Sequence, residues 1–192
     1  MPDTISTAEK IVLHVGCGQK GREALPSDWQ GEGWREIRLD IEAEVEPDIV
    51  ASMLDMSAVP DNSVDRVWSS HNLEHVYTHE VPQALSEMLR VLKPGGRLAL
   101  MVPNIEAAAR AIAEGKIEQP LYQSPSGPIT PLDMVYGHIA SVRAGATPMQ
   151  HKTAFTNLSL RQRLVDAGFE EVTVERKPFD LIGRARKPAA AR

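Results

Sequence analysis

The chain has 192 residues, 42% of them hydrophobic, and a formal net charge of -5 at pH 7. This length supports one domain with a sizeable core and is too short for two full ones. The acidic balance disfavours nucleic acid as a partner, and the single cysteine, Cys17, excludes an internal disulfide and predicts a reducing compartment, the cytoplasm. The apolar runs are strand-sized and residues 1–10 are polar, so we expect neither a membrane span nor a signal peptide.

The first element is an apolar, β-branched run at 11–15, which predicts a buried strand. It ends in Gly16-Cys17-Gly18, and glycine permits both a sharp turn and the close approach of a ligand to the backbone. The following segment is polar and contains proline and glycine, so at most one helical turn fits over 22–33. Further strands are expected at 34–40, 48–51 and 64–70.

A well-patterned helix is predicted over 79–92, because apolar side chains recur there at helical spacing. Thr78 is its expected N-cap, and Pro94-Gly95-Gly96 ends it before a buried strand at 97–102. The pattern then weakens, and residues 104–150 are predicted to form an insertion or lid. Within it we expect a helix at 105–114, a loop at 115–131 and a helical segment at 132–144.

Regular patterns return with an amphipathic helix at 157–167, capped by Thr156 or Asn157. Two strands follow at 171–176 and 179–186, and the short turn between them requires an antiparallel pair. The chain is then expected to form one domain over 1–192, ending in a flexible tail at 187–192. The predicted fold is α/β: a three-layer sandwich on a Rossmann-like, mainly parallel seven-stranded sheet with an antiparallel last strand.

In such a sheet a ligand lies at the carboxyl ends of the strands, near the switch point. Asp40 ends the second strand 22 residues after Gly18, where a carboxylate can accept hydrogen bonds from a ribose diol. Asp55 follows the third strand and is placed to accept a hydrogen bond from an adenine amino group. Met56 next to it offers a backbone N–H and an apolar side chain.

Four segments carry a resemblance to a known family. They are Leu-His-Val-Gly-Cys-Gly (13–18), Arg-Leu-Asp-Ile (38–41), Val-Asp-Arg-Val-Trp-Ser-Ser-His-Asn-Leu-Glu-His-Val (64–76) and Leu-Arg-Val-Leu-Lys-Pro-Gly-Gly-Arg-Leu (89–98). In this order they resemble the class I S-adenosylmethionine-dependent methyltransferases of the type-11-like kind. The resemblance implies S-adenosyl-L-methionine as cofactor. The implied cofactor-binding residues are Gly16, Cys17, Gly18, Asp40, Ile41, Asp55, Met56, Ser70 and His71.

One departure from that family concerns His14, because many members carry an acid two residues before the first glycine. We expect this change to weaken the anchoring of the ligand's amine. Histidine is also the natural general base near neutral pH. The catalytic candidates are His71, placed at a strand end, and His138 and His151, which flank the end of the predicted lid. No metal site is expected, because the segment around His71 lacks a His-Glu-x-x-His spacing.

The predicted function is transfer of a methyl group from S-adenosylmethionine to a small-molecule or glycan-type acceptor. One alternative is an NAD-binding oxidoreductase, since Gly16-x-Gly18-x-x-Gly21 matches that fingerprint by letter. The segment over 22–33 cannot supply the long helix which that fingerprint requires. A second alternative is a non-catalytic binding protein of the same fold. The sequence indicates neither the acceptor atom nor the oligomeric state.

Overall fold

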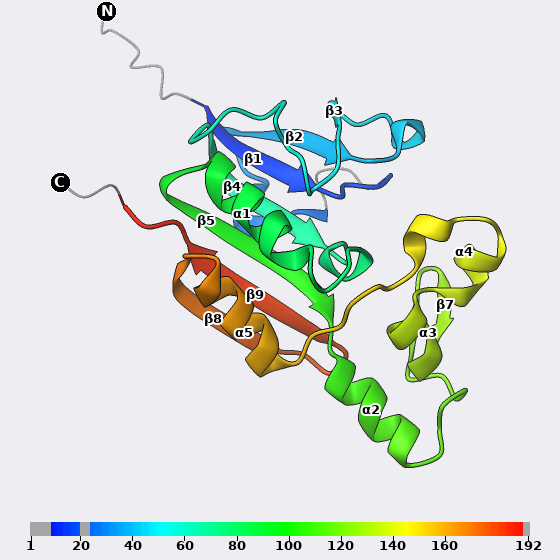
Figure 1. Cartoon of the computed structure of the whole chain (residues 1–192). Coiled ribbons are helices and arrows are strands. Elements are labelled where there is room, and N and C mark those ends of the chain that lie inside the picture. Colours follow the sequence, from blue (N-terminus) through cyan, green and yellow to red (C-terminus); the bar gives the residue numbers. More distant parts are fainter. Residues whose placement is uncertain (1–8, 20–23, 190–192) are drawn as a thin grey trace, which may run out of the picture.

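A computed structural model of the chain describes residues 9–19 and 24–189. Its centre is a seven-stranded sheet of order β3-β2-β1-β4-β5-β9-β8 (Figure 1). Neighbouring strands pair in parallel except β9, which runs antiparallel to both β5 and β8. The predicted Rossmann-like sheet with one antiparallel last strand is therefore confirmed. The strands are β1 (Lys10–Val15), β2 (Trp34–Asp40), β3 (Ile49–Val50), β4 (Val64–Ser70), β5 (Leu92–Pro103), β8 (Glu170–Arg176) and β9 (Asp180–Arg186).

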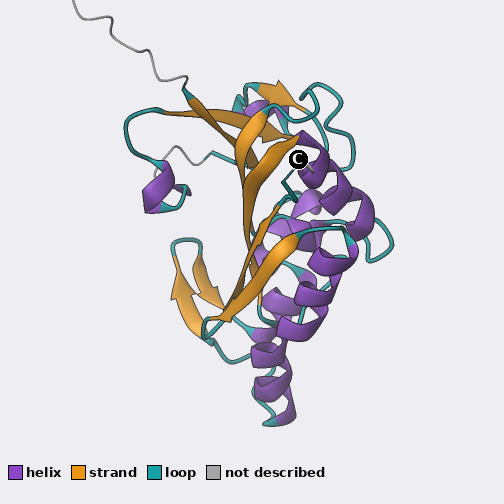
Figure 2. Ribbon diagram, turned by 90° about the vertical axis from the view of Figure 1, so that its left-hand side faces the viewer, coloured by secondary structure: helices purple, strands orange, loops and turns teal. Residues whose placement is uncertain are grey.

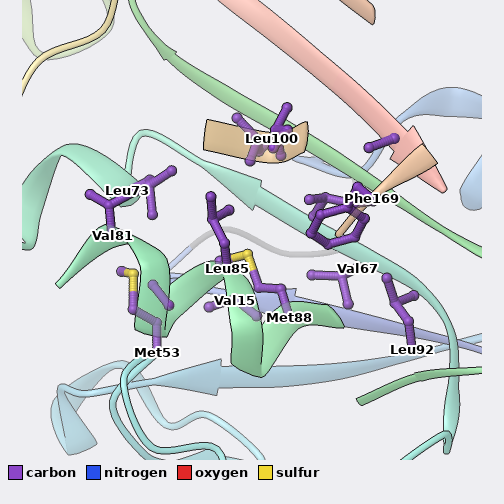
Figure 3. Close-up of a cluster of buried hydrophobic side chains, with 14 of the residues drawn as sticks. Val15, Met53, Val67, Leu73, Val81, Leu85, Met88, Leu92, Leu100 and Phe169 are labelled. Atoms are coloured by element: carbon purple, nitrogen blue, oxygen red, sulfur yellow. The ribbon is translucent and has the colours of Figure 1, made fainter. Parts of the chain in front are cut away.

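Most helices cover one face of this sheet, as the edge-on view in Figure 2 shows. The main core lies between that face and helices α1 (Val81–Val91) and α5 (Asn157–Asp166). Figure 3 shows the α1 side chains meeting those of the strands, among them Leu85, Met88 and Val67. Alternation along the strands sends every second residue to the opposite face. That face carries a smaller cluster, closed by Leu25 and Trp29 around a 3-10 turn at Ser27–Trp29.

The start of α1 differs from the predicted one. Its N-cap is Glu80, which makes no side-chain capping bond, and Thr78 lies in the preceding turn. The Oγ1 atom of Thr78 instead pairs with Oγ1 of Thr153 at 2.8 Å. At α5 the prediction holds, because Thr156 forms a capping box with Ser159.

The insertion leaves the sheet after β5 and extends beyond the carboxyl ends of the parallel strands (Figure 1). The expected loop at 115–131 is wrong in part, since it contains a small hairpin. The expected helical segment at 132–144 is divided at Gly137, whose φ is +91° and whose added Cβ would lie 2.0 Å from the Met149 carbonyl oxygen. The elements are α2 (Ile105–Ala113), β6 (Tyr122–Ser124), β7 (Gly127–Ile129), α3 (Pro131–Tyr136), α4 (Ile139–Arg143) and a 3-10 turn at Thr147–Met149.

Some predictions fall partly or wholly outside the described residues. Gly21, the third glycine of the dinucleotide fingerprint, is one of them. Of the predicted tail, residues 190–192 lie outside the description, whereas the N–H of Lys187 donates to the carbonyl of Gly96 at 2.9 Å. Within the described residues, no helix has the length and apolar character needed to cross a membrane.

Candidate active site

Asp40 and Gly18 tie together the carboxyl ends of two neighbouring parallel strands. The N–H of Gly18 donates to Oδ2 of Asp40 at 2.8 Å, and the N–H of Glu42 donates to Oδ1 at 3.0 Å. The Asp40 side chain is buried at the end of β2, beside β1. Each carboxylate oxygen still has a lone pair for a further donor. The arrangement fits a group that accepts hydrogen bonds from a ribose diol.

The two glycines of the first turn have different roles. An added Cβ at Gly16 would lie 2.0 Å from Nδ2 of Asn72, so Gly16 makes room for a side chain from the loop after β4. Gly18 has a φ of +54°, and no atom of the described residues lies within 4 Å of an added Cβ. The backbone at Gly18 is therefore open for contact with a ligand. Cys17 between them is buried, and burial raises the pKa of its thiol, which disfavours a nucleophilic thiolate.

Arg38 holds the glycine turn through a hydrogen bond to its backbone, a role that the sequence did not predict. Its Nη2 donates to the carbonyl of Gly18 at 2.6 Å, and its Nη1 donates to the carbonyl of Glu46 at 3.0 Å. Arg38 lies two residues before Asp40 on β2, so alternation along the strand was the available signal. Ile41, directly after Asp40, is 64% exposed and offers an apolar surface at the site.

The adenine contacts expected of Asp55 and Met56 need correction in part. The N–H of Met56 donates to Oε2 of Glu87 at 2.7 Å, and the Met56 side chain is fully buried in the main core. Met56 therefore has neither a free N–H nor an accessible side chain for a ligand. Asp55 is exposed and accepts a hydrogen bond from the N–H of Ser57, and its role at adenine stays a prediction.

His14 lies inside the sheet region and is paired with an acid of the neighbouring strand. Its Nδ1 lies 2.8 Å from Oε1 of Glu36 on the neighbouring strand, and both side chains are almost entirely buried. Alternation along β1 places His14 on the opposite sheet face from Leu13 and Val15. The histidine at this position is accommodated by a partner on β2.

Ser70 is the last residue of β4, and His71 follows it directly. His71 has a φ of 51°, an uncommon conformation for a residue with a side chain. Its ring lies between two carboxylates, with Nδ1 3.5 Å from Oε1 of Glu74 and Nε2 3.5 Å from Oδ1 of Asp180. Burial raises the pKa of Asp180. The strained backbone thus holds the His71 ring between Glu74, in the turn after β4, and Asp180, the first residue of β9.

Glu74 is the centre of a histidine cluster. Its side chain is 1% exposed, and neither carboxylate oxygen has a hydrogen-bond partner among the described residues. His151, from the end of the insertion, places Nε2 4.0 Å from Oε1 of Glu74. Burial opposes ionisation of Glu74, but the surrounding histidines hold its pKa below the usual value, while burial lowers the pKa of His151. Two catalytic candidates, His71 and His151, therefore meet at one buried carboxylate.

His138, the third catalytic candidate, has different neighbours. Its Nδ1 lies 2.7 Å from Oγ of Ser141 at the start of α4.

Glu74 and Asp180 were not predicted as site residues, because an acid inside a Leu-Glu-His segment or at the start of a late strand carries no distinctive spacing. Only the fold brings them to His71.

A central seven-stranded sheet with glycines and an acid at its switch point defines a Rossmann-like α/β protein, a class in which nucleotide-type cofactors bind at this crevice. Residues 13–100 match the family model described as "Methyltransferase domain". The resemblance to the class I S-adenosylmethionine-dependent methyltransferases is thereby confirmed, and S-adenosylmethionine is the cofactor of this family.

Individual known proteins agree with this family. The chain is 28% identical over 132 residues to Methyltransferase GfsG of Streptomyces halstedii, covering 58% of this chain and 45% of that protein. The chain thus spans less than half the length of this curated relative. A S-adenosylmethionine-dependent methyltransferase of Methanosarcina mazei superposes with a TM-score of 0.62 at 18% identity, covering 95% and 94% of the two chains.

A second solved structure contains ligands. It is the 1,6-didemethyltoxoflavin-N1-methyltransferase of Burkholderia thailandensis, with bound 1,6-didemethyltoxoflavin and S-adenosylhomocysteine. Its TM-score is 0.54 at 17% identity, covering 93% of this chain and 71% of that chain. At this identity the likeness is one of fold.

Proposed function

We propose that this chain is an enzyme that transfers a methyl group from S-adenosylmethionine to a small-molecule or glycan-type acceptor. The proposal is carried by the bond between Gly18 and Asp40, which joins an open glycine turn to a buried carboxylate at the switch point. When bound, S-adenosylmethionine supplies an already activated methyl group, so the protein's task is mainly alignment and exclusion of water.

In this proposal the chain's own residues divide that task. Asp40 accepts hydrogen bonds from the ribose hydroxyls, Gly18 leaves room along the methionine and ribose, and Ile41 and Asp55 face the adenine. Ser70 and His71 border the transferred methyl group. A lone free thiol, Cys17, agrees with action in a reducing compartment such as the cytoplasm.

We further propose that residues 104–150 belong to the same domain and form the acceptor-side lid. The segment lies beyond the carboxyl ends of β4 and β5 (Figure 1). It is held to the sheet by contacts such as the stacking of Tyr122 on Phe179, with ring centroids 4.6 Å apart. A small acceptor is favoured by such enclosure, and the Burkholderia thailandensis neighbour acts on a small heterocycle.

The test is calorimetry with S-adenosylmethionine, S-adenosylhomocysteine and NAD, followed by a turnover assay that detects S-adenosylhomocysteine with a panel of small acceptors. We expect binding of S-adenosylmethionine with a dissociation constant on the order of micromolar and no binding of NAD. Binding of NAD alone would favour the oxidoreductase alternative. Cofactor binding with no turnover on any acceptor would favour a non-catalytic binding protein.

A further inference from the structure

Glu74, His75 and His151 converge in a way that the proposed methyl transfer does not use. One potential ligand atom from each residue lies within 4.8 Å of those from the other two. Glu74 and His75 are in the 3-10 turn after β4, whereas His151 is at the end of the insertion. Residues far apart in sequence are thus brought to one point, and we name these three the Glu74 cluster.

The buried Glu74 carboxylate has histidines nearby but makes no hydrogen bond to the described residues. It is 1% exposed, and both oxygens lack a hydrogen-bond partner among residues 9–19 and 24–189. The nearest histidine nitrogens, on His71 and His151, lie 3.5 and 4.0 Å from Oε1. A buried carboxylate is stable when it is hydrogen-bonded or when it coordinates a cation. The separation to His151 is too long for a hydrogen bond and leaves space for an ion.

Each histidine of the cluster has its Nδ1 atom beside a backbone carbonyl oxygen. Nδ1 of His75 lies 3.0 Å from the carbonyl oxygen of Gln150, and Nδ1 of His151 lies 3.0 Å from that of Met134. Because a carbonyl can only accept, each Nδ1 carries a proton, and a ring that is neutral has its lone pair on Nε2. A backbone carbonyl behind the second nitrogen is the usual support of a metal-bound histidine.

The backbone around the cluster is already fixed. The N–H groups of Lys152 and Thr153 both donate to the carbonyl of Glu74, at 2.8 and 3.2 Å. The rings of His75 and His151 meet edge to face, with centroids 5.0 Å apart. Only side-chain adjustments are therefore needed to bring the three ligand atoms to the spacing of about 3.4 Å that a tetrahedral zinc ion with bonds near 2.1 Å imposes.

We propose that Glu74, His75 and His151 bind a divalent transition-metal ion of the zinc type. Two imidazoles and one carboxylate suit this class of ion and leave a fourth position open. A narrow pocket borders Glu74 and His151 and is lined by apolar residues from both the sheet and the insertion. The ion would join the insertion to the loop after β4.

No metal site is expected from the sequence, because the segment around His71 lacks a His-Glu-x-x-His spacing and His151 lies far from that segment in the sequence. His79, the next histidine after His75, is exposed and stacks on Tyr77 with ring centroids 5.7 Å apart. The proposal does not depend on the proposed methyl transfer, and its test requires neither cofactor nor acceptor.

The test uses the full chain, stripped with EDTA, and titrates it with Co²⁺ and then with Zn²⁺ as competitor. We expect one ion per chain, visible d–d absorption of bound Co²⁺, its displacement by Zn²⁺, and a rise in Tm with Zn²⁺. His75→Ala and His151→Ala should each weaken binding by at least roughly tenfold, whereas His79→Ala, the matched control, should not.

Glu74→Gln keeps the size of the side chain and removes its charge, so it tests the site even where a histidine variant fails to fold. We expect this variant to lose the Co²⁺ spectrum and the Zn²⁺-dependent rise in Tm while its far-ultraviolet circular dichroism stays unchanged. Absence of Co²⁺ absorption in the unmodified chain would overturn the proposal. Equal metal binding by the unmodified chain, Glu74→Gln and His75→Ala would overturn it as well.

Discussion

The backbone N–H of Gly18 donates to the Oδ2 atom of Asp40 at 2.8 Å, so one carboxylate both shapes the glycine turn and faces the proposed cofactor site. The bond joins the ends of β1 and β2, which are adjacent and parallel. Sequence spacing alone predicted a role for Asp40 at a ligand. The structure adds that the backbone of the glycine turn is hydrogen-bonded to this side chain.

Asp40→Ala should therefore weaken binding of S-adenosylmethionine by at least tenfold, or about 1.4 kcal/mol. The variant removes a ligand acceptor and also releases the N–H of Gly18. Glu44→Ala, at an exposed acid in the next 3-10 turn, is the control and should bind normally. Calorimetry measures both, and unchanged affinity in Asp40→Ala would refute the ribose assignment.

Arg90 provides a test of pH dependence. Its guanidinium donates to Glu87 at 2.7 Å and to the carbonyls of Met56 and Val59 at 2.9 Å each, which ties α1 to the segment before β4. Hydrogen bonding from Arg90 is the main reason that the pKa of Glu87 lies below its usual value. Arg90→Ala should lower the free energy of unfolding by roughly 1–3 kcal/mol near neutral pH.

The sign of the pH effect follows from the lowered pKa of Glu87. Its contribution to stability is complete above the unfolded-state value of about 4.3 and is lost as pH falls through the lower folded-state value. The difference in free energy of unfolding between the unmodified chain and Arg90→Ala, measured in urea, should therefore become smaller in acid. Lys116→Ala, which breaks an exposed pair with Glu114, should show little effect at any pH. A gap that widens in acid would contradict this assignment.

Most of the sheet could be predicted from the sequence because its strands combine β-branched runs with sharp ends. The strands 34–40 and 64–70 have the bounds expected of them. The insertion was harder, since the hairpin of β6 and β7 depends on packing such as Tyr122 against Phe179 rather than on a strong local pattern.

In the candidate site, too, some residues could be predicted from local sequence and others depend on tertiary contacts. Asp40 and Gly18 follow from position after a strand, which is a local property. Glu74 and Asp180 become site residues only because the end of β4, the start of β9 and the insertion meet in space. Met56 was misassigned because its buried side chain and engaged N–H are set by helix α1, which lies far along the chain.

The helix caps allow a matched comparison of a confirmed prediction with a wrong one. Thr156 accepts a hydrogen bond from the N–H of Ser159 at 3.1 Å, whereas Thr78 makes no capping bond to α1. Thr156→Ala should cost about 1 kcal/mol of stability. Thr78→Ala should cost less, because its hydroxyl bond to Thr153 is exposed. Urea unfolding measures both, and an equal or larger loss in Thr78→Ala would be inconsistent with this structure.

Gly16 and Gly18 make a second matched pair, because alanine would meet different surroundings at each. Both have positive φ, at +69° and +54°, so each substitution carries a backbone cost of about 1–2 kcal/mol. Only at Gly16 would the new methyl group also collide with Asn72. Gly16→Ala should therefore destabilise the fold by clearly more than Gly18→Ala does, as measured by thermal unfolding.

For cofactor binding we expect the larger effect at Gly18, whereas for stability we expect it at Gly16. Gly16→Ala combined with Asn72→Ala should recover the part of the stability that the collision removed and leave only the backbone cost. Gly18→Ala needs no such relief, because within residues 9–19 and 24–189 no atom lies within 4 Å of the added Cβ. Its methyl group would instead occupy the space proposed for S-adenosylmethionine, so calorimetry should show a marked loss of affinity in a protein that is nearly as stable. A Gly18→Ala variant that binds normally would show that the cofactor does not lie against this part of the turn.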